Sequence, residues 1–458
     1  MNRRVSTLAL VPWLAGCQPA PSVPEARPPA VTAAPTPPSS SPPISASSRA
    51  NPPLTSQAVP DSAADAGSSP PTDAPRPSSP AQVAAATTAA RASNGFGFDL
   101  FARVRLAGGN VIFSPASVAI ALGMAQAGAR GETAAEMAKT LHVDLIADAP
   151  GALGGLLAVA NGLDGKEGLE VHVADEVWGQ QGMAFEQDYL ALLQKDFGAP
   201  VATVDFAGAS GEAAGAINAW AAAKTHDRIP TIIDHPLNPM TRLVLTNAIY
   251  MKGKWQVPFP KAATKTEDFH TPARTVKVPM MTRHDEMAYA SVDGVQVVEL
   301  PYRGGLSMMV ALPDAKDGLS AVEAQLARRY EGWRSALKSG RSEVDLKLPR
   351  WTMTWSAELT VPLQAMGMAR AFAMSADFSG IYRPGGLAIA SVLHKAFVEV
   401  NEEGTEAAGV TAIGVVLTSA VIRQGPVPVF HADHPFLYVI RERTTDAVLF
   451  MGHVVDPE

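Results

Sequence analysis

The stretch Lys395–Gln424 reads KAFVEVNEEGTEAAGVTAIGVVLTSAVIRQ and contains two segments of strand-like composition. The first, Ala396–Val400, alternates small, aromatic and β-branched residues, which is typical of a buried strand. The polar turn Asn401–Gly404 ends it with a conformationally free glycine. The second segment runs from Ala407 to Ile422 without a charge or a proline, and this is about three times the usual length of a strand.

The length of this second segment leaves two interpretations open. Its content of Val, Ile and Thr fits a central strand buried on both faces. It is too short and too rich in Gly and Thr for a membrane-spanning helix. A strand-competent segment of this length is an aggregation hazard if it stays exposed. We therefore favour the second interpretation, in which the chain stores the segment outside any sheet and inserts it later.

The residues around this segment resemble the hinge of the serpin family and the strand that precedes it. Those of the hinge are Glu402, Glu403, Gly404, Thr405, Ala407 and Ala408, and those of the strand are Val392–Val400. Further blocks that match the family are Val111–Ser117, Asn247–Trp255, Val297–Tyr302 and Asp433–Arg441. The resemblance extends from Asn94 to the end of the chain. It implies an α+β fold with three β-sheets, about eight or nine helices and an exposed reactive-centre loop.

The resemblance also implies a function, namely suicide-substrate inhibition of serine, or cysteine, endopeptidases. The cleaved loop would enter the central sheet as a new strand and trap the acyl-enzyme. A hinge that enters a sheet needs small side chains and no proline, and this hinge satisfies both conditions. Strand alternation predicts that Thr405 faces inward and Glu406 outward. The alternative is a non-inhibitory serpin that acts as a binding or chaperone-like module.

Two counts place the reactive bond differently. The spacing of the family, carried forward from Gly404, gives Thr418–Ser419, whereas counting back from the block that begins at Phe430 gives Val421 or a position as late as Gln424. We prefer the forward count because the inserted segment must span a fixed length of sheet. Its small and apolar flanks predict an elastase-, chymotrypsin- or subtilisin-like target. The rival bond, Arg423–Gln424, would suit a trypsin-like enzyme.

Four residues match the shutter that serpins have beneath the central sheet, where the resemblance implies a hydrogen-bonded, conformational role: Ser114, Ser117, Asn247 and His394. A residue and a turn elsewhere in the chain depart from the pattern of the family. Asp175 stands where an asparagine is usual, and the turn Thr225–Ile229 lacks its common glycine.

The sequence contains none of the common catalytic motifs. There is no Gly-x-Ser-x-Gly elbow, no His-Glu-x-x-His helix and no glycine loop for phosphates, and a single cysteine excludes thiolate metal sites. A net charge of −7 provides no basic surface for nucleic acid. We therefore expect a protein that is no enzyme, uses no cofactor or metal and binds no nucleic acid. The resemblance implies a monomer.

The N-terminus predicts export. Residues 1–17 read as a signal peptide, with a positive start, a short apolar core and a lipobox-like Leu14–Cys17. We expect lipid on Cys17, then a disordered linker over residues 18–93, rich in Pro, Ala and Ser, and a serpin domain over 94–458. Gln18, in place of aspartate, removes a signal for retention in the inner membrane. The prediction is a bacterial lipoprotein anchored to the cell envelope, at the outer membrane, or an extracellular protein.

Overall fold

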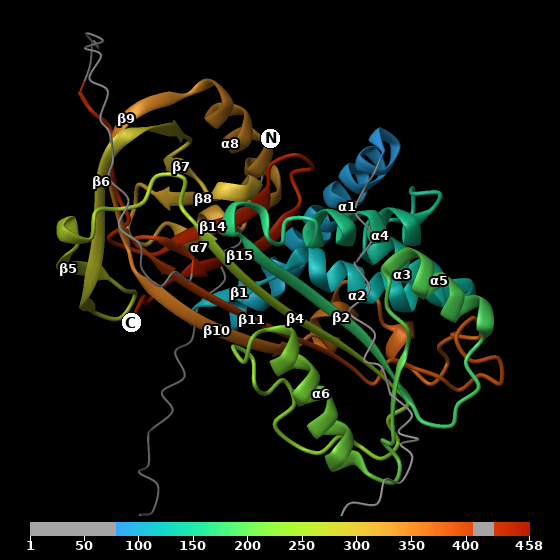
Figure 1. Ribbon diagram of the computed structural model, residues 1–458. Helices are drawn as coiled ribbons and strands as arrows, with labels where there is room; N and C mark the ends of the chain where they lie inside the picture. Colours follow the sequence, from blue (N-terminus) through green and yellow to red (C-terminus); the bar gives the residue numbers. More distant parts are fainter. Residues whose placement is uncertain (1–78, 406–425) are drawn as a thin grey trace, which may run out of the picture. The chain divides into compact units, whose positions relative to one another are not determined.

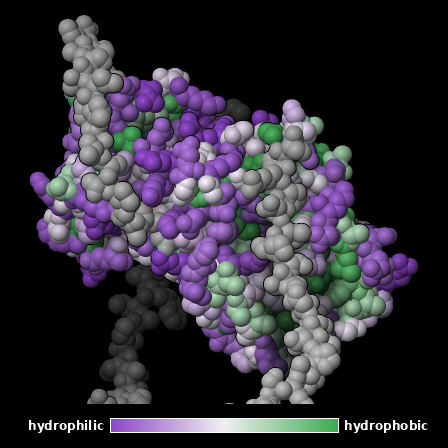
Figure 2. Space-filling view, in the orientation of Figure 1, coloured by the Kyte–Doolittle hydropathy of each residue, from purple (hydrophilic) through white to green (hydrophobic). Residues whose placement is uncertain are grey.

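The computed structural model of the chain describes residues 79–405 and 426–458 (Figure 1). They belong to the second of two units into which the chain divides, Ser69–Glu458, and only this unit is considered below. The predicted signal peptide and most of the predicted linker lie outside the described residues. On the face seen in Figure 2, hydrophobic side chains form separate groups among hydrophilic ones.

Nine α-helices lie within the described ranges. They are α1 (Pro80–Val104), α2 (Pro115–Ala127), α3 (Gly131–Thr140), α4 (Ala149–Asn161), α5 (Gln187–Phe197), α6 (Ser210–Lys224), α7 (Leu319–Glu323), α8 (Leu326–Ser339) and α9 (Thr360–Ala365). Of the helices described, none is long and apolar enough to cross a membrane.

The strands form two hydrogen-bonded sets. The six-stranded sheet has the order β10 (Trp351–Glu358), β11 (Ser391–Asn401), β12 (Gly404–Thr405), β4 (Leu243–Lys254), β2 (Glu170–Gln180) and β3 (Ala202–Val204). The nine-stranded set has the order β1 (Val111–Phe113), β15 (Val448–Val454), β14 (Phe436–Glu442), β8 (Leu306–Pro313), β7 (Val295–Pro301), β6 (Thr275–Val292), β9 (Arg341–Pro349) and β13 (Val429–His431), with β5 (Lys265–His270) paired to β6.

The nine-stranded set consists of two groups that share one long strand. β6 has 18 residues and pairs with β5, β9 and β7 at successive positions. Its first part belongs with β5, β9 and β13, and its last part with β7, β8, β14, β15 and β1. The predicted α+β fold is confirmed, and its third sheet is joined to the second through β6.

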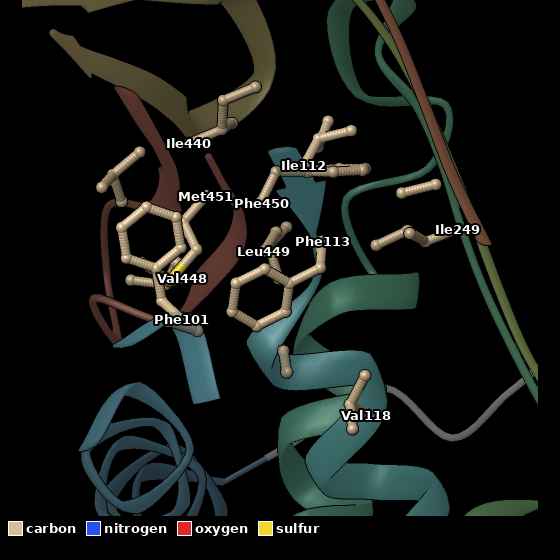
Figure 3. Close-up of a cluster of buried hydrophobic side chains, with 14 of the residues drawn as sticks. Phe101, Ile112, Phe113, Val118, Ile249, Ile440, Val448, Leu449, Phe450 and Met451 are labelled. Carbon is tan, nitrogen blue, oxygen red and sulfur yellow. The ribbon is translucent and has the colours of Figure 1, made fainter. Parts of the chain in front are cut away.

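The helix α2 fills the space between the two strand sets. It contacts β2 and β4 of the six-stranded sheet and β15 of the other set. Its alanines let both sheets approach closely, Gly123 makes room for Leu153 of α4, and nearly all of its residues are buried. Figure 3 shows part of this core, where Phe101 of α1 and Phe113 of β1 lie with Val118 of α2 and Phe450 of β15. The rings of Phe101 and Phe113 are stacked 6.3 Å apart.

The helix α1 begins at Pro80, so residues 80–93, which the sequence assigns to a disordered linker, are helical. Ser79 caps the helix reciprocally with Gln82 in a capping box, and Pro80 occupies the first turn. The alanines of this stretch, which suggested a disordered linker, instead pack closely. Ala86 is fully buried, and a Cβ added to Gly155 of α4 would lie 3.6 Å from the Cβ of Ala86. Small side chains here allow two helices to approach rather than prevent folding.

A pair of glycine substitutions tests the packing of β1 against β15. A Cβ on Gly452 of β15 would lie 1.9 Å from the carbonyl oxygen of Val111, whereas a Cβ on Gly332 of α8 would meet nothing within 4 Å. We expect Gly452→Ala to destabilise the domain by about 1–3 kcal/mol, as overpacking does. The control, Gly332→Ala, should stabilise it by about 0.5–1 kcal/mol. Melting temperatures check both, and a Gly452→Ala variant as stable as the unaltered chain would contradict this packing.

Candidate functional site

The candidate site lies where β11 and β4 run side by side in the six-stranded sheet. The two strands are parallel and pair over six positions, from Ser391 opposite Val244 to Ala396 opposite Ile249. We call these six pairs the seam. Beyond the seam, β12 lies between β11 and β4 and is antiparallel to both. The seam therefore ends at a place where a further strand already separates its two strands.

The turn between β11 and β12 is held by its two glutamates. Glu402 is buried and accepts hydrogen bonds from Arg350 Nε at 2.8 Å and Thr264 Oγ1 at 2.5 Å. Burial alone would raise the pKa of Glu402, but these hydrogen bonds outweigh it and hold the pKa below its ordinary value. Glu403 forms an ion pair with Lys261. The turn is thus fixed on the side that faces β10 and the segment after β4.

The two residues of β12 fit closely between their neighbours. Gly404 has φ 151°, and a Cβ there would lie 1.9 Å from the carbonyl oxygen of Gly253, so only glycine fits. Thr405 pairs with Val400 and Gly253 and is buried. Its Oγ1 is 2.8 Å from the hydroxyl of Tyr302. Thr405 therefore faces inward, as the alternation of the sequence predicts.

The rest of the predicted loop lies outside the described residues. This applies to the hinge residues Ala407 and Ala408, to the predicted reactive bond Thr418–Ser419, to its alternatives Val421, Arg423 and Gln424, and to the predicted lipid site Cys17. These assignments stay predictions.

The four predicted shutter residues come together beneath the seam, with Asp175 as a fifth member. His394, Asn247 and Asp175 occupy paired positions on the adjacent strands β11, β4 and β2. Ser114 is the N-cap of α2, and its side chain accepts from the backbone N–H of Ser117. All five side chains are buried.

A directional chain of hydrogen bonds links these residues across the sheet. The backbone N–H of Ser114 donates to His394 Nε2 at 3.2 Å, so Nδ1 carries the ring proton and donates to Asn247 Oδ1. Asn247 Nδ2 donates to Asp175 Oδ1, and Ser117 Oγ donates to the same oxygen at 3.0 Å. The bond between His394 and Asn247 crosses the seam, so opening the seam breaks it.

The burial of this cluster sets its charge state. Desolvation lowers the pKa of His394 to about 3, so the ring is neutral. Desolvation raises the pKa of Asp175 to about 8, although hydrogen bonds from Asn247 and Ser117 oppose the shift. The second carboxyl oxygen of Asp175 has no hydrogen-bond partner in the part of the chain that the structure describes. The cluster is therefore polar but largely uncharged at neutral pH.

A Ser, His and Asp set suggests a catalytic triad, but the geometry here excludes one. A triad needs the histidine to take a proton from the serine hydroxyl while the aspartate holds its other nitrogen. His394 instead bonds to a backbone N–H and to Asn247, and Asp175 bonds to Ser117. The buried set holds strands together and offers no accessible nucleophile.

The comparisons with known proteins show the family and agree with the fold. The Serpin family model, described as serine protease inhibitor, matches residues 91–457. An uncharacterized serpin-like protein of Thermococcus kodakarensis is 39% identical over 372 residues, covering 80% of this chain and 85% of that protein. The leukocyte elastase inhibitor of Sus scrofa is 36% identical over 378 residues, covering 80% of this chain and 98% of that protein.

A solved structure leads to the same family. Human thyroxine-binding globulin has 26% sequence identity and a TM-score of 0.74, and the match covers 81% of this chain and 99% of that one. The fold and these similarities thus define a serpin architecture. The chain belongs to the serpin family.

The structure adds partners that the sequence did not indicate. Arg350 and Thr264 hold Glu402, and Tyr302 holds Thr405. All three lie far from the hinge in the chain, so no local pattern could pair them. The departure from the family at Asp175 was visible in the sequence, but its place in the hydrogen-bond chain was not.

The raised pKa of Asp175 predicts a pH dependence. The folded state keeps a proton that the unfolded chain releases near pH 4. The free energy of unfolding should therefore fall as the pH rises from about 4 to about 8 and level off above that, by at most ~1.4 kcal/mol per pH unit. Asp175→Asn should remove this part of the slope and raise the melting temperature at pH 8.

Melting curves between pH 5 and 9 make the comparison. Asp317→Asn, which removes one exposed carboxylate, is the control. Equal slopes for the Asp175→Asn variant and the unaltered chain would mean that Asp175 is ionised in the folded state.

Proposed function

We propose that this chain inhibits serine, or cysteine, endopeptidases by trapping an acyl-enzyme as its cleaved loop enters the seam. The observation that carries this proposal is β12, which lies antiparallel between two strands that are parallel to each other. A strand that continued from β12 along the seam would be antiparallel to both neighbours throughout. One parallel ladder would then be replaced by two antiparallel ladders, which are also slightly more stable per residue.

The register of β12 supports the proposal further. Thr405 pairs with Val400 and Gly253, and six more residues in the same register would bring Thr411 opposite His394 and Asn247. Insertion would break the hydrogen bond between these two side chains. A threonine hydroxyl both donates and accepts, so Thr411 could bond to either neighbour and prevent an unpaired buried polar group.

A binding function is the second candidate. Thyroxine-binding globulin, a structural neighbour, is named for a bound small molecule, so a serpin fold does not by itself define an inhibitor. The small residues and the absence of proline in the hinge favour inhibition, because both ease entry into a sheet. A covalent complex with a protease separates the two functions.

For the target we propose an elastase-, chymotrypsin- or subtilisin-like protease that cleaves Thr418–Ser419. The apolar residues before this bond would be buried in the pocket of such an enzyme, which contributes ~1–3 kcal/mol of discrimination. The similarity to a leukocyte elastase inhibitor supports the same class. The rival Arg423–Gln424 would require a protease with a negative charge in its pocket.

The first test is a mixture of the chain with pancreatic elastase or subtilisin, examined on a denaturing gel. We expect a covalent complex that survives SDS. We also expect a released C-terminal peptide whose measured mass shows that its first residue is Ser419. Thr411→Arg should turn the chain into a substrate and lower the yield of complex about tenfold or more, because insertion in the register of β12 would bury an unpaired guanidinium opposite His394 and Asn247.

Met374→Arg, at a residue that is 83% exposed, is the matched control and should trap the protease normally. A Thr411→Arg variant that still forms the complex in full would contradict insertion along the seam. A peptide that begins at Gln424 would move the reactive bond to Arg423.

For the location we propose that the chain is exported and held at the cell envelope by lipid on Cys17. The proposal rests on the lipobox-like sequence and on the Pro-, Ala- and Ser-rich stretch after it. Cys17→Ser should move the protein from the membrane fraction of its host to the soluble fraction. A variant that still sediments with membranes after a salt wash would mean that another part of the chain is the anchor.

A further inference from the structure

Two histidines from separate elements face each other on the outer side of the six-stranded sheet. His172 lies on β2, opposite Tyr250 of β4, and His226 lies in the turn directly after α6. Their Nε2 atoms are 3.2 Å apart. The ring of Tyr250 is stacked on that of His172, with centroids 6.1 Å apart, and also contacts that of His226. Tyr250 therefore helps to fix both imidazoles.

The turn that carries His226 has an unusual backbone. His226 and Asp227 have φ 48° and 60°, which is the left-handed region that glycine adopts most easily. The turn is fixed by hydrogen bonds from the N–H of Asp227 to Ala222 O and from the N–H of Arg228 to Thr225 O, each 2.9 Å. Residues with side chains thus occupy two positions suited to glycine, and one of them directs an imidazole at His172.

We propose that His172 and His226 form a binding site for a divalent transition-metal ion of the zinc class. Two imidazole nitrogens bound to one tetrahedral Zn²⁺ at ~2.0–2.1 Å lie about 3.3 Å from each other, close to the observed 3.2 Å. The nearest carboxylate is Asp164, whose Oδ1 is 3.7 Å from His172 Nε2. No group of three or more His, Cys, Asp or Glu side chains in the described ranges is arranged to hold a metal, so the pair supplies two ligands and water completes the shell.

The surroundings suit this role. His172 and Asp164 line a cavity of about 430 Å³ together with Lys224 of α6, and the His172 side chain is 32% exposed. His226 does not line this cavity but is itself exposed, so an ion can reach both imidazoles from solvent.

A metal at this site would tie α6 to the sheet. The helix and the residues after it pack on both strands of the seam: Ala221 and Ile229 lie against Ala248 of β4 and Phe397 of β11. In Figure 1, α6 runs along the six-stranded sheet. Because separation of β11 from β4 disturbs these contacts, an ion between His226 and β2 should slow it. This second step rests on the proposed function, whereas metal binding does not.

Calorimetric titration of the full-length chain with ZnCl₂, after removal of metals with a chelator, tests the site. We expect one saturable site with a Kd below about 100 μM. His172→Gln and His226→Gln should each weaken binding about tenfold or more, since each removes one of two protein ligands. His235→Gln, at another exposed histidine, is the control and should bind as the unaltered chain does.

A titration of the unaltered chain with Co²⁺, followed by its visible absorption, requires no substitution. A tetrahedral nitrogen-containing site gives intense bands and hexa-aqua cobalt does not. The proposal is overturned if the unaltered chain shows no saturable site, or if both single variants keep its affinity.

The effect on function has a separate readout. If the chain traps a protease, Zn²⁺ should lower the ratio of trapped to released protease for the unaltered chain and leave the ratio unchanged for His226→Gln. An equal effect of Zn²⁺ on both proteins would show that the ion acts on the protease, and would overturn the link to the seam. If the chain traps no protease, the titrations still decide whether the site exists.

Discussion

The parallel pairing of β11 with β4 is the constraint on which the rest of the structure depends. Six residue pairs form this seam, and parallel pairs are slightly less stable per residue than antiparallel ones. One side-chain hydrogen bond, from His394 to Asn247, crosses it in the buried layer beneath. The seam thus holds the sheet closed with a parallel ladder, and an inserted antiparallel strand would replace it with two ladders that are more stable per residue.

The open end of the seam shows how closely this state is balanced. Gly404 and Thr405 already occupy the space between the two strands, and contacts with Gly253 and Tyr302 fix them there. A longer strand could extend directly from β12, because the direction and register of β12 between β11 and β4 are already set. Two things oppose the entry of a longer strand. The six residue pairs of the seam must separate, and the hydrogen bond between His394 and Asn247 in the buried cluster must break.

The side chains of the buried cluster are polar but largely uncharged at neutral pH. His394 is neutral, and Asp175 has a carboxyl group whose ionised form burial disfavours. An asparagine at position 175 would hold the same strands with no titratable group. The carboxyl group of Asp175 therefore makes the stability of the closed sheet depend on pH. The asparagine that is usual in the family at this position would not.

The sequence predicted the features that depend on local patterns or on motifs of the family. The strand at Ala396–Val400 lies within β11, Thr405 faces inward, and Ser114, Ser117, Asn247 and His394 meet. It failed at α1, because composition alone could not show that alanines such as Ala86 would pack against another helix. It could not pair His172 with His226, which are 54 residues apart, because that contact depends on how α6 lies on the sheet.

The two faces of β4 bring these observations together. Asn247 points into the buried cluster, and Tyr250, three residues later, packs on the outer side against His172 and His226. Since strand residues alternate between faces, one rigid strand connects the inner hydrogen-bond chain to the outer histidine pair. β4 also forms one side of the seam. A change in charge within the cluster and a link between α6 and β2 would therefore bias the same event, the separation of β4 from β11, although the two sites share no side chain.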